Sequence, residues 1–99
     1  MNHLVVFSPK AIADIAEVLD FLLPLAGERA ARRFVDDLVD HCHGFATFPE
    51  RGLSRADLAP GLRIVGYRRR ASIAFLVQNE TITIMRIFYA GREIRLDRT

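Results

Sequence analysis

The chain has 99 residues, of which 51% are hydrophobic, and its formal net charge is +2 at neutral pH. A chain of this length and composition is expected to form one domain, residues 1–99, around one hydrophobic core. No apolar run approaches the ~20 residues that span a bilayer, and the first ten residues lack the pattern of a signal peptide. Cys42 is the single cysteine, so an intramolecular disulfide is excluded and a cytoplasmic location is expected.

Charge is divided unevenly between the two halves of the chain. Residues 1–50 carry four basic and eight acidic side chains, whereas residues 51–99 carry ten arginines and four acidic side chains. Thirteen of the fourteen basic side chains are arginine, whose planar fork suits carboxylate and phosphate groups. An arginine-rich genome explains the preference for arginine equally well, but it does not explain the division between the halves. The basic half therefore indicates an acidic partner, either protein or nucleic acid.

The first predicted elements are a short strand and a helix. Leu4 to Phe7 is a short apolar run, and Ser8-Pro9 predicts that a helix begins directly after it, because serine caps helices and proline suits their first position. Pro24 and Gly27 mark the end of this helix. Its apolar stripe consists of Ile12, Ile15, Ala16, Leu19, Leu22 and Leu23. A second apolar face consists of Val18, Phe21 and Leu25. Two faces are more than one buried stripe requires, so the second is either deeper core, which we favour, or a partner surface.

A second helix is predicted from Glu28 to Phe48. Its apolar stripe consists of Ala31, Phe34, Val35, Leu38, Cys42, Phe45 and Ala46. Because only a few residues join the two helices, they are expected to form an antiparallel hairpin. Residues 50–61 are predicted to be a connecting loop that closes with Pro60-Gly61, a pair typical of type II turns.

The periodicity then changes to that of strands. Three β-branched or aromatic-rich segments follow, at residues 62–67, 71–78 and 81–89. Asn79-Glu80 between the last two is a two-residue hairpin signal. The order of strand, helix, helix and three-strand meander predicts an α+β two-layer domain, with an N-terminal strand and an antiparallel helical hairpin packed on an antiparallel sheet.

No metal and no cofactor are expected. His41-Cys42-His43 contains metal-binding residue types, but neighbours on a helix point about 100° apart and cannot converge on one ion. Cys42 falls on the predicted buried stripe, where a free cysteine behaves as a small hydrophobe. The sequence contains no glycine-rich phosphate loop, no zinc-finger spacing and no nucleophile elbow.

The remaining chemical signal is arginine and tyrosine on the predicted sheet. These residues are Arg63, Tyr67, Arg68, Arg69, Arg70, Arg86, Tyr89 and Arg92. Strand alternation places Arg63 on one face with Val65 and Tyr67, and it places Arg86 on one face with Ile84 and Phe88. Arginine beside aromatic residues is typical both of protein hot spots and of stacking on single-stranded RNA. Residues 68–70 lie between two strands and are also explained by an exposed basic turn.

Five segments together resemble a known family. They are FSPKAIADIAEVLDFL, ERAARRFVDDL, FPERG, DLAPGLRIVGYRR and ITIMRIFYAGRE, in this order and spacing over nearly the whole chain. This arrangement resembles the ParE branch of the RelE/ParE toxin superfamily, from bacterial type II toxin–antitoxin modules. The resemblance implies a helical hairpin packed on an antiparallel sheet, and a ParD-like antitoxin whose C-terminal segment wraps and neutralises the toxin. It also implies inhibition of DNA gyrase without catalytic chemistry. The alternative is a RelE-like, ribosome-dependent mRNA endoribonuclease.

The residue types weigh against the ribonuclease. RNA cleavage needs a general base, a general acid and cations on the phosphate, and Arg63, Arg86 and Tyr89 are the possible equivalents of the residues that RelE-like enzymes use. No lysine follows Lys10 and no histidine follows His43. A base is therefore hard to name, because arginine stays protonated. ParE chains more often have histidine where Tyr89 stands, a departure that keeps the ribonuclease interpretation open.

We therefore predict partner contacts and no catalytic residue. The candidates for contact with the antitoxin or the target are Val18, Phe21, Leu25, Arg63, Tyr67, Arg68, Arg86, Tyr89 and Arg92. Arg86 is expected to hold the sheet surface or an acidic partner, with its aliphatic stem packed on neighbours and its head in a polar environment.

Overall fold

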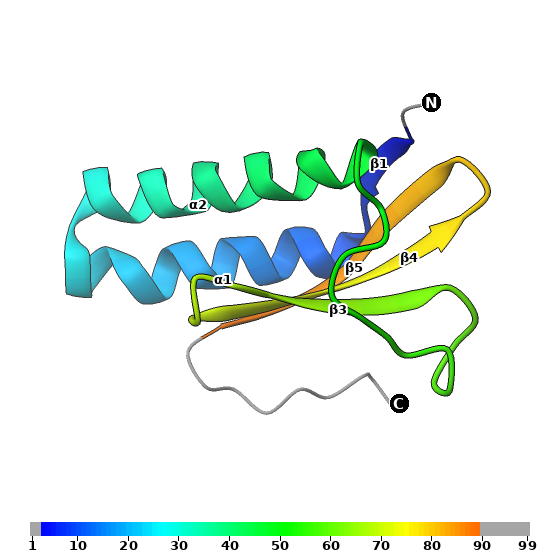
Figure 1. Cartoon of the computed structure of the whole chain (residues 1–99). Helices are drawn as coiled ribbons and strands as arrows, with labels where there is room; N and C mark the ends of the chain where they lie inside the picture. Colours follow the sequence, from blue (N-terminus) through cyan, green and yellow to red (C-terminus); the bar gives the residue numbers. More distant parts are fainter. Residues whose placement is uncertain (1–2, 90–99) are drawn as a thin grey trace.

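The structure, a computed structural model, describes residues 3–89. In chain order the elements are β1 (Leu4–Phe7), α1 (Pro9–Ala26), α2 (Glu28–His43), the 3₁₀ helix η1 (Gly44–Ala46), β2 (Leu53–Ser54), β3 (Leu62–Tyr67), β4 (Ala71–Gln78) and β5 (Thr81–Tyr89). The strands form one sheet in the order β1-β5-β4-β3-β2, in which β1 is parallel to β5 and the other pairs are antiparallel. Both helices lie side by side on one face of this sheet (Figure 1). The predicted α+β fold is confirmed, and so are the bounds of the last three strands.

Ser8 connects the first strand to the first helix, as predicted. Its Oγ accepts a hydrogen bond from the backbone N–H of Ala11 at 3.0 Å, which caps α1. The same hydroxyl donates to the carbonyl of Met85 at 2.9 Å, and the Ser8 N–H donates to the carbonyl of Ile84 at 2.9 Å. One residue therefore ends β1, begins α1 and fixes both against β5.

None of the helices within residues 3–89 is long and apolar enough to cross a membrane.

The buried stripe of α1 differs from the prediction. The buried residues of this helix are Ala11, Asp14, Val18 and Leu22. Val18 therefore belongs to the core, as favoured, whereas Phe21 is 44% exposed and Leu25 is 70% exposed, so the core interpretation is wrong for these two residues. Ile12, assigned to the buried stripe, is also exposed. The reason is that α1 packs mainly on α2 and β5, and this arrangement buries one stripe of the helix.

The second helix is shorter than predicted, and the connecting loop holds a strand. α2 ends at His43 rather than Phe48, and the chain tightens into η1, where Phe45 stacks on Phe75 with ring centroids 4.5 Å apart. The two residues of β2 pair with β3, and so short a strand has no recognisable alternation. The turn at Gly61 is confirmed, because this glycine has φ +81° and the Leu62 N–H donates to the carbonyl of Ala59 at 3.1 Å.

A β-bulge in β5 changes which side chains share a face. Ala74 is opposite Arg86 and Phe75 is opposite Ile84, so Met85 is the extra residue. Ile84 consequently faces the helices. Arg86 lies on the other face of the sheet with Phe88, and its guanidinium is 5.1 Å from the centroid of the Phe88 ring. The prediction that Arg86 shares a face with Phe88 is confirmed, but the prediction that it shares a face with Ile84 is wrong. Simple alternation cannot anticipate an inserted residue.

Candidate functional site

Arg86 forms an internal ion pair with α1. Its Nε donates to Asp14 Oδ2 at 2.8 Å and its Nη2 donates to Asp14 Oδ1 at 3.2 Å. The same carboxylate accepts the backbone N–H of Ile87 at 2.8 Å. The Asp14 side chain is 8% exposed and the Arg86 side chain is 25% exposed. The hydrogen bond to Asp14 raises the pKa of Arg86 above its already high ordinary value.

The position of this pair follows from the end of β1. The parallel pairing stops where Phe7 is opposite Ile84, so β5 continues beyond its neighbour as a sheet edge. Asp14 lies over that edge and accepts a backbone N–H that β1 does not reach. The carboxylate thus satisfies a buried donor and a partly buried cation together. Of the two roles expected for Arg86, this geometry favours holding the sheet surface.

Arg63 also bonds within the chain. Its Nε donates to the carbonyl of Arg51 at 2.9 Å and its Nη2 donates to the carbonyl of Gly52 at 3.1 Å. These bonds hold the loop that leads into β2 against β3. The approach is close, because a Cβ at Gly52 would lie 2.1 Å from the carbonyl oxygen of Ile64.

The two tyrosines of the sheet belong to a row of aromatic rings beneath the helices. Tyr89 lies 5.7 Å from Phe21 and 5.4 Å from Phe34, and Phe34 lies 5.8 Å from Tyr67, measured between ring centroids. Tyr67 and Tyr89 are buried. Arg68 closes the row, with its guanidinium 5.0 Å from the Tyr67 ring centroid. The structure therefore brings together candidate residues from α1, β3, β5 and the β3–β4 turn.

The β3–β4 turn consists of three arginines, two of which have an unusual backbone conformation. Arg68 has φ +52° and Arg69 has φ +57°, and the Arg70 N–H donates to the carbonyl of Tyr67 at 3.0 Å. Two central residues with positive φ are typical of a type I′ turn, which favours glycine and asparagine. Arg68 is held by an ion pair with Asp37 of α2 at 3.2 Å. Arg70 donates to the Tyr89 hydroxyl at 3.5 Å, a long hydrogen bond.

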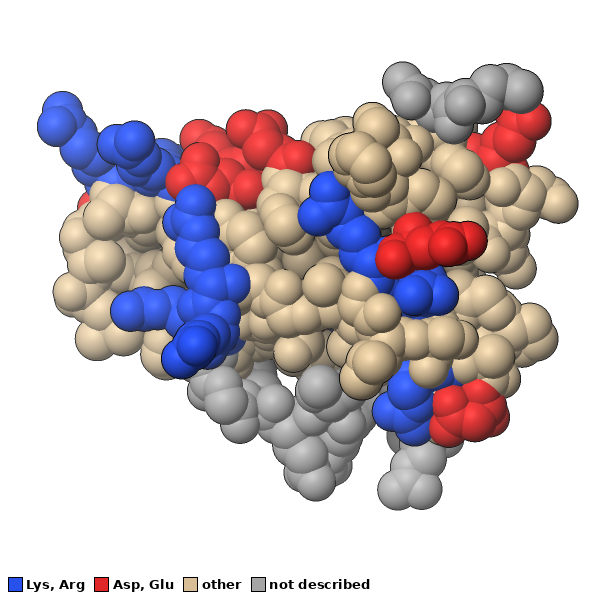
Figure 2. Space-filling model, in the orientation of Figure 1, with Lys and Arg blue, Asp and Glu red and all other residues tan. Residues whose placement is uncertain are grey.

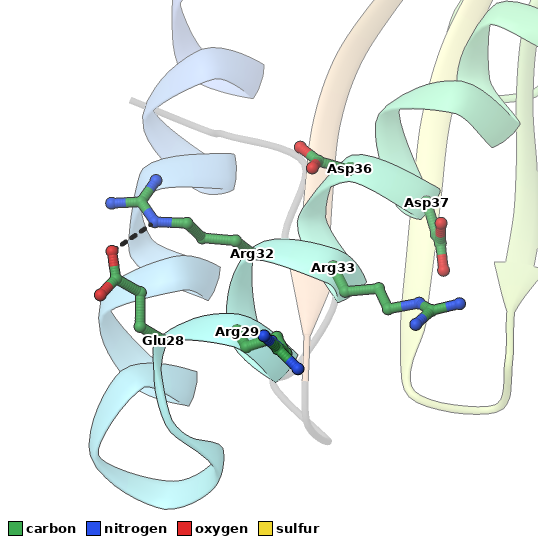
Figure 3. Close-up of a pocket in the computed structure, with 6 residues that line it drawn as sticks. All are labelled: Glu28, Arg29, Arg32, Arg33, Asp36 and Asp37. Carbon is green, nitrogen blue, oxygen red and sulfur yellow. Dashed lines mark hydrogen bonds and ion pairs between the residues drawn. The ribbon is translucent and has the colours of Figure 1, made fainter.

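A surface hollow lies along the amino-terminal half of α2 (Figure 3). It is lined by Glu28, Arg29, Arg32, Arg33, Asp36 and Asp37. Glu28 and Arg32 form an exposed ion pair at 3.0 Å, while Arg33 and Asp37 point towards the β3–β4 hairpin. Because one helix supplies the whole lining and its charges are mixed, we interpret this surface as a solvated helix face.

The three residues of His41-Cys42-His43 lie in different environments. The ring of His41 lies 4.8 Å from the ring of Tyr67, and the ring of His43 lies 5.5 Å from the ring of Phe7, measured between ring centroids. Cys42 is fully buried, and burial raises the pKa of its thiol to about 12. In the described part of the chain no group of three or more His, Cys, Asp or Glu residues could hold a metal ion.

The candidate residues separate into three groups. Val18, Tyr67 and Tyr89 are buried, Arg63 and Arg86 bond within the chain, and Phe21, Leu25 and Arg68 reach the surface, where Arg68 is also paired with Asp37. Arg92 lies outside the described residues.

Sequence reasoning missed two parts of these arrangements, namely Asp14 as the partner of Arg86 and Phe34 as the link in the aromatic row. Asp14 carried a usable signal, because it stands three residues after Ala11 and four before Val18, on the stripe that becomes buried. A carboxylate at such a position predicts a paired arginine elsewhere.

Comparison with known proteins agrees with this architecture. A family model described as the ParE toxin of type II toxin–antitoxin system, parDE, matches residues 5–94. A solved structure of a chromosomal ParDE toxin–antitoxin system from P. aeruginosa matches with a TM-score of 0.77 and 27% identity, covering 90% of this chain and 97% of that one. The toxin–antitoxin complex RelBE2 from Mycobacterium tuberculosis shares the fold, with a TM-score of 0.65 and 17% identity, over 90% of this chain and 99% of that one. The search of curated proteins finds no match. Because the family model covers most of its length, the chain belongs to the ParE toxin family of type II toxin–antitoxin systems.

Proposed function

We propose that this chain is a cytoplasmic bacterial toxin that inhibits DNA gyrase without catalytic chemistry, and that a ParD-like antitoxin neutralises it. Membership of the ParE family supports the toxin role. The similarity to a solved ParDE system supports an antitoxin partner. The gyrase target rests on the resemblance to ParE toxins and on the chemistry of the sheet.

The observation that carries this proposal is that the side chains available for RNA cleavage have structural partners. Arg86 binds Asp14, and Arg63 binds two loop carbonyls. Tyr89 is buried in the aromatic row between Phe21 and Phe34. A phosphodiester-cleaving site needs cations and proton-transfer groups that face the substrate. These three side chains instead hold the sheet, the loop and the helices together.

Two assays on the purified protein test the target. We expect the toxin to inhibit supercoiling of a relaxed plasmid by DNA gyrase, and to leave mRNA intact in a translation extract. Addition of the cognate antitoxin should restore supercoiling. Cleaved transcript together with unaffected supercoiling would refute the gyrase proposal and favour the ribonuclease.

The exposed end of α1 offers an apolar docking position for the antitoxin. Phe21 and Leu25 are exposed large hydrophobic residues four positions apart, hence on one side of the helix. Apolar anchors at this spacing are typical of contacts with an amphipathic segment. The acidic residues of such a segment would be attracted to the arginines of the β3–β4 turn.

A pair of substitutions tests this docking position. Phe21→Glu with Leu25→Glu should weaken antitoxin binding at least about tenfold, because hot-spot residues contribute more than about 1 kcal/mol each. Ile12→Glu is the matched control, since Ile12 is an exposed apolar residue near the other end of α1. Isothermal titration calorimetry compares the unsubstituted protein, the double variant and the control, with their folds checked by circular dichroism. Equal antitoxin affinity of the three folded proteins would show that the antitoxin docks elsewhere.

A further inference from the structure

The strand β1 lies at one edge of the sheet (Figure 1). The N–H groups of Leu4 and Ser8 donate to backbone carbonyls in β5 and in the turn before it, so they point towards β5. Because backbone groups alternate in direction along a strand, those of Val5 and Phe7 point away from β5. Within residues 3–89 the backbone N–H and C=O groups of Val5 and Phe7 have no hydrogen-bond partner. This edge can therefore accept another strand.

The outward side chains of this edge strand are apolar and exposed. Val5 and Phe7 pack against the core beneath the helices, so Leu4 and Val6 lie on the opposite, helix-free face of the sheet. Leu4 is 64% exposed and Val6 is 37% exposed. Edge strands are usually protected from pairing with another chain by a charge, a proline, a bulge or a very short length. The two residues of β2 are such a short strand at the opposite edge, whereas the LVVF sequence of β1 contains no charge and no proline.

The ends of β1 limit where a partner strand can bind. The N–H of His3 also points outwards, and it already donates to the carbonyl of Ala46 at 3.0 Å. At the other end Pro9 begins α1 and has no N–H to donate. Only Val5 and Phe7 thus offer both backbone groups to a partner.

A second copy of β1 fits these limits. When two copies pair antiparallel with Val6 opposite Val6, Val5 of each copy lies opposite Phe7 of the other. Every bond across the interface then joins groups that have no partner within the described part of a single chain. Registers centred on Val5 or on Phe7 lack this property, because they set Phe7 opposite His3 or Val5 opposite Pro9.

The charges at this end of the molecule also favour a second copy. Figure 2 shows basic side chains over the β3–β4 turn and in the middle of the view, but none among the described residues at the far right, around the β4–β5 turn. Glu80 is exposed in that turn beside the start of β1, and Lys10 is exposed just after the end of β1. Antiparallel pairing sets the start of one β1 beside the end of the other. Each Glu80 therefore lies at the same end of the interface as Lys10 of the second copy, and their opposite charges attract.

We propose that β1 pairs antiparallel with β1 of a second copy of this chain, about a twofold axis at Val6. The pairing joins the two sheets into one. It also sets Leu4 and Val6 of both copies side by side on the helix-free face, where they remove each other's surface from water. Both copies use the same surface, as a twofold dimer requires. Two strands of four residues bury little area, so the dimer is weak and forms at high protein concentration.

This dimer depends on neither the proposed gyrase target nor the proposed antitoxin site. It is measured with the toxin alone, whereas those proposals are measured with gyrase and with the antitoxin. Phe21 and Leu25 lie near the end of α1, whereas β1 leads into the start of that helix. A toxin dimer therefore leaves the docking position at the end of α1 accessible.

Sedimentation velocity over a series of protein concentrations tests the dimer. The unsubstituted protein should change from monomer to dimer as its concentration rises. Val6→Lys should raise the dissociation constant at least about tenfold, because it replaces two facing apolar side chains with two like charges. Leu53→Lys is the matched control, since Leu53 is an exposed apolar residue of the other edge strand, and it should associate within about twofold of the unsubstituted protein. Glu80→Lys should weaken association, and Lys10→Glu in the same chain should restore it.

A cross-linking experiment tests the register. Directly opposite residues of the Val6 type, in a pair without mutual hydrogen bonds, have Cα atoms about 4.5 Å apart, which a disulfide can span. Mild oxidation of Val6→Cys should therefore give a covalent dimer, and the native Cys42 does not compete because it is fully buried. Leu53→Cys, on the other edge strand, should remain monomeric under the same conditions.

Amide hydrogen exchange of the unsubstituted protein covers the case in which a variant is misfolded. The amides of Val5 and Phe7 should exchange rapidly in dilute protein and become protected at concentrations where the dimer forms. A monomer at every concentration, equal association of Val6→Lys or equal cross-linking of Leu53→Cys would each overturn the proposal. Protection of these two amides by the antitoxin but not by a higher toxin concentration would also overturn it, since the edge would then accept a strand of another protein.

Discussion

The ion pair of Asp14 with Arg86 is expected to be a major contributor to the stability of this fold, and Asp14→Ala tests that expectation. The substitution removes the acceptor of three hydrogen bonds, two from the Arg86 guanidinium and one from the buried N–H of Ile87. An unsatisfied buried N–H costs about 1–3 kcal/mol. The partly exposed guanidinium loses bonds worth about 1.5–3 kcal/mol, of which water recovers a part.

Together these losses amount to about 3 kcal/mol. The whole domain is expected to be stable by only about 5–15 kcal/mol, so Asp14→Ala should remove a large share of it. For a chain of this size, 1 kcal/mol corresponds to about 4–8 °C in Tm. The melting temperature should therefore fall by roughly 12 °C or more.

Urea denaturation followed by circular dichroism measures the loss, and a double-mutant cycle isolates the pair. Asp14→Ala and Arg86→Ala combined should cost less than the sum of the two single changes, with a coupling of about 1–3 kcal/mol. Glu28→Ala is the control, because the pair of Arg32 and Glu28 is 59% and 72% exposed and should contribute under about 0.5 kcal/mol. A loss below about 1 kcal/mol for Asp14→Ala, or additive single changes, would refute the reasoning.

Three further predictions follow from local environments. The pKa of His41 is lowered in the folded protein, so the unfolded chain binds more protons than the folded protein just below pH 6.5. The free energy of unfolding should therefore fall as the pH drops through that window. Urea titrations at several pH values measure this dependence, and His41→Gln should flatten it. Gly52→Ala should destabilise the protein more than Gly27→Ala, because both glycines have positive φ but a Cβ at Gly52 meets backbone, whereas one at Gly27 has nothing within 4 Å; equal losses in urea would contradict this. Cys42, buried with a pKa of about 12, should resist a thiol reagent at pH 8 until the protein is unfolded; rapid labelling of the native protein would show that the thiol is accessible.

Much of the fold follows from local sequence patterns. The cap at Ser8, the turn at Gly61 and the three C-terminal strands depend on neighbouring residues, so the sequence predicts them correctly. The family is likewise predicted by the order and spacing of short segments and agrees with the family match. The predicted end of the second helix is less accurate, because the helix ends at His43 and not at Phe48. The chain tightens where Phe45 contacts Phe75, and this tertiary contact is not visible in the local sequence.

The role of the central arginine of β5 was decided only by the tertiary structure. The sequence shows that an apolar strand contains Arg86 and that a helical stripe contains Asp14, residues 72 positions apart along the chain. Their meeting requires that β1 stop at Phe7, that Met85 form a bulge and that α1 lie over the freed edge of β5. Each condition depends on the packing of separate elements, which residue type and spacing do not encode. The sequence by itself therefore determined which residues carry charge, and the packing determined that this pair stabilises the fold.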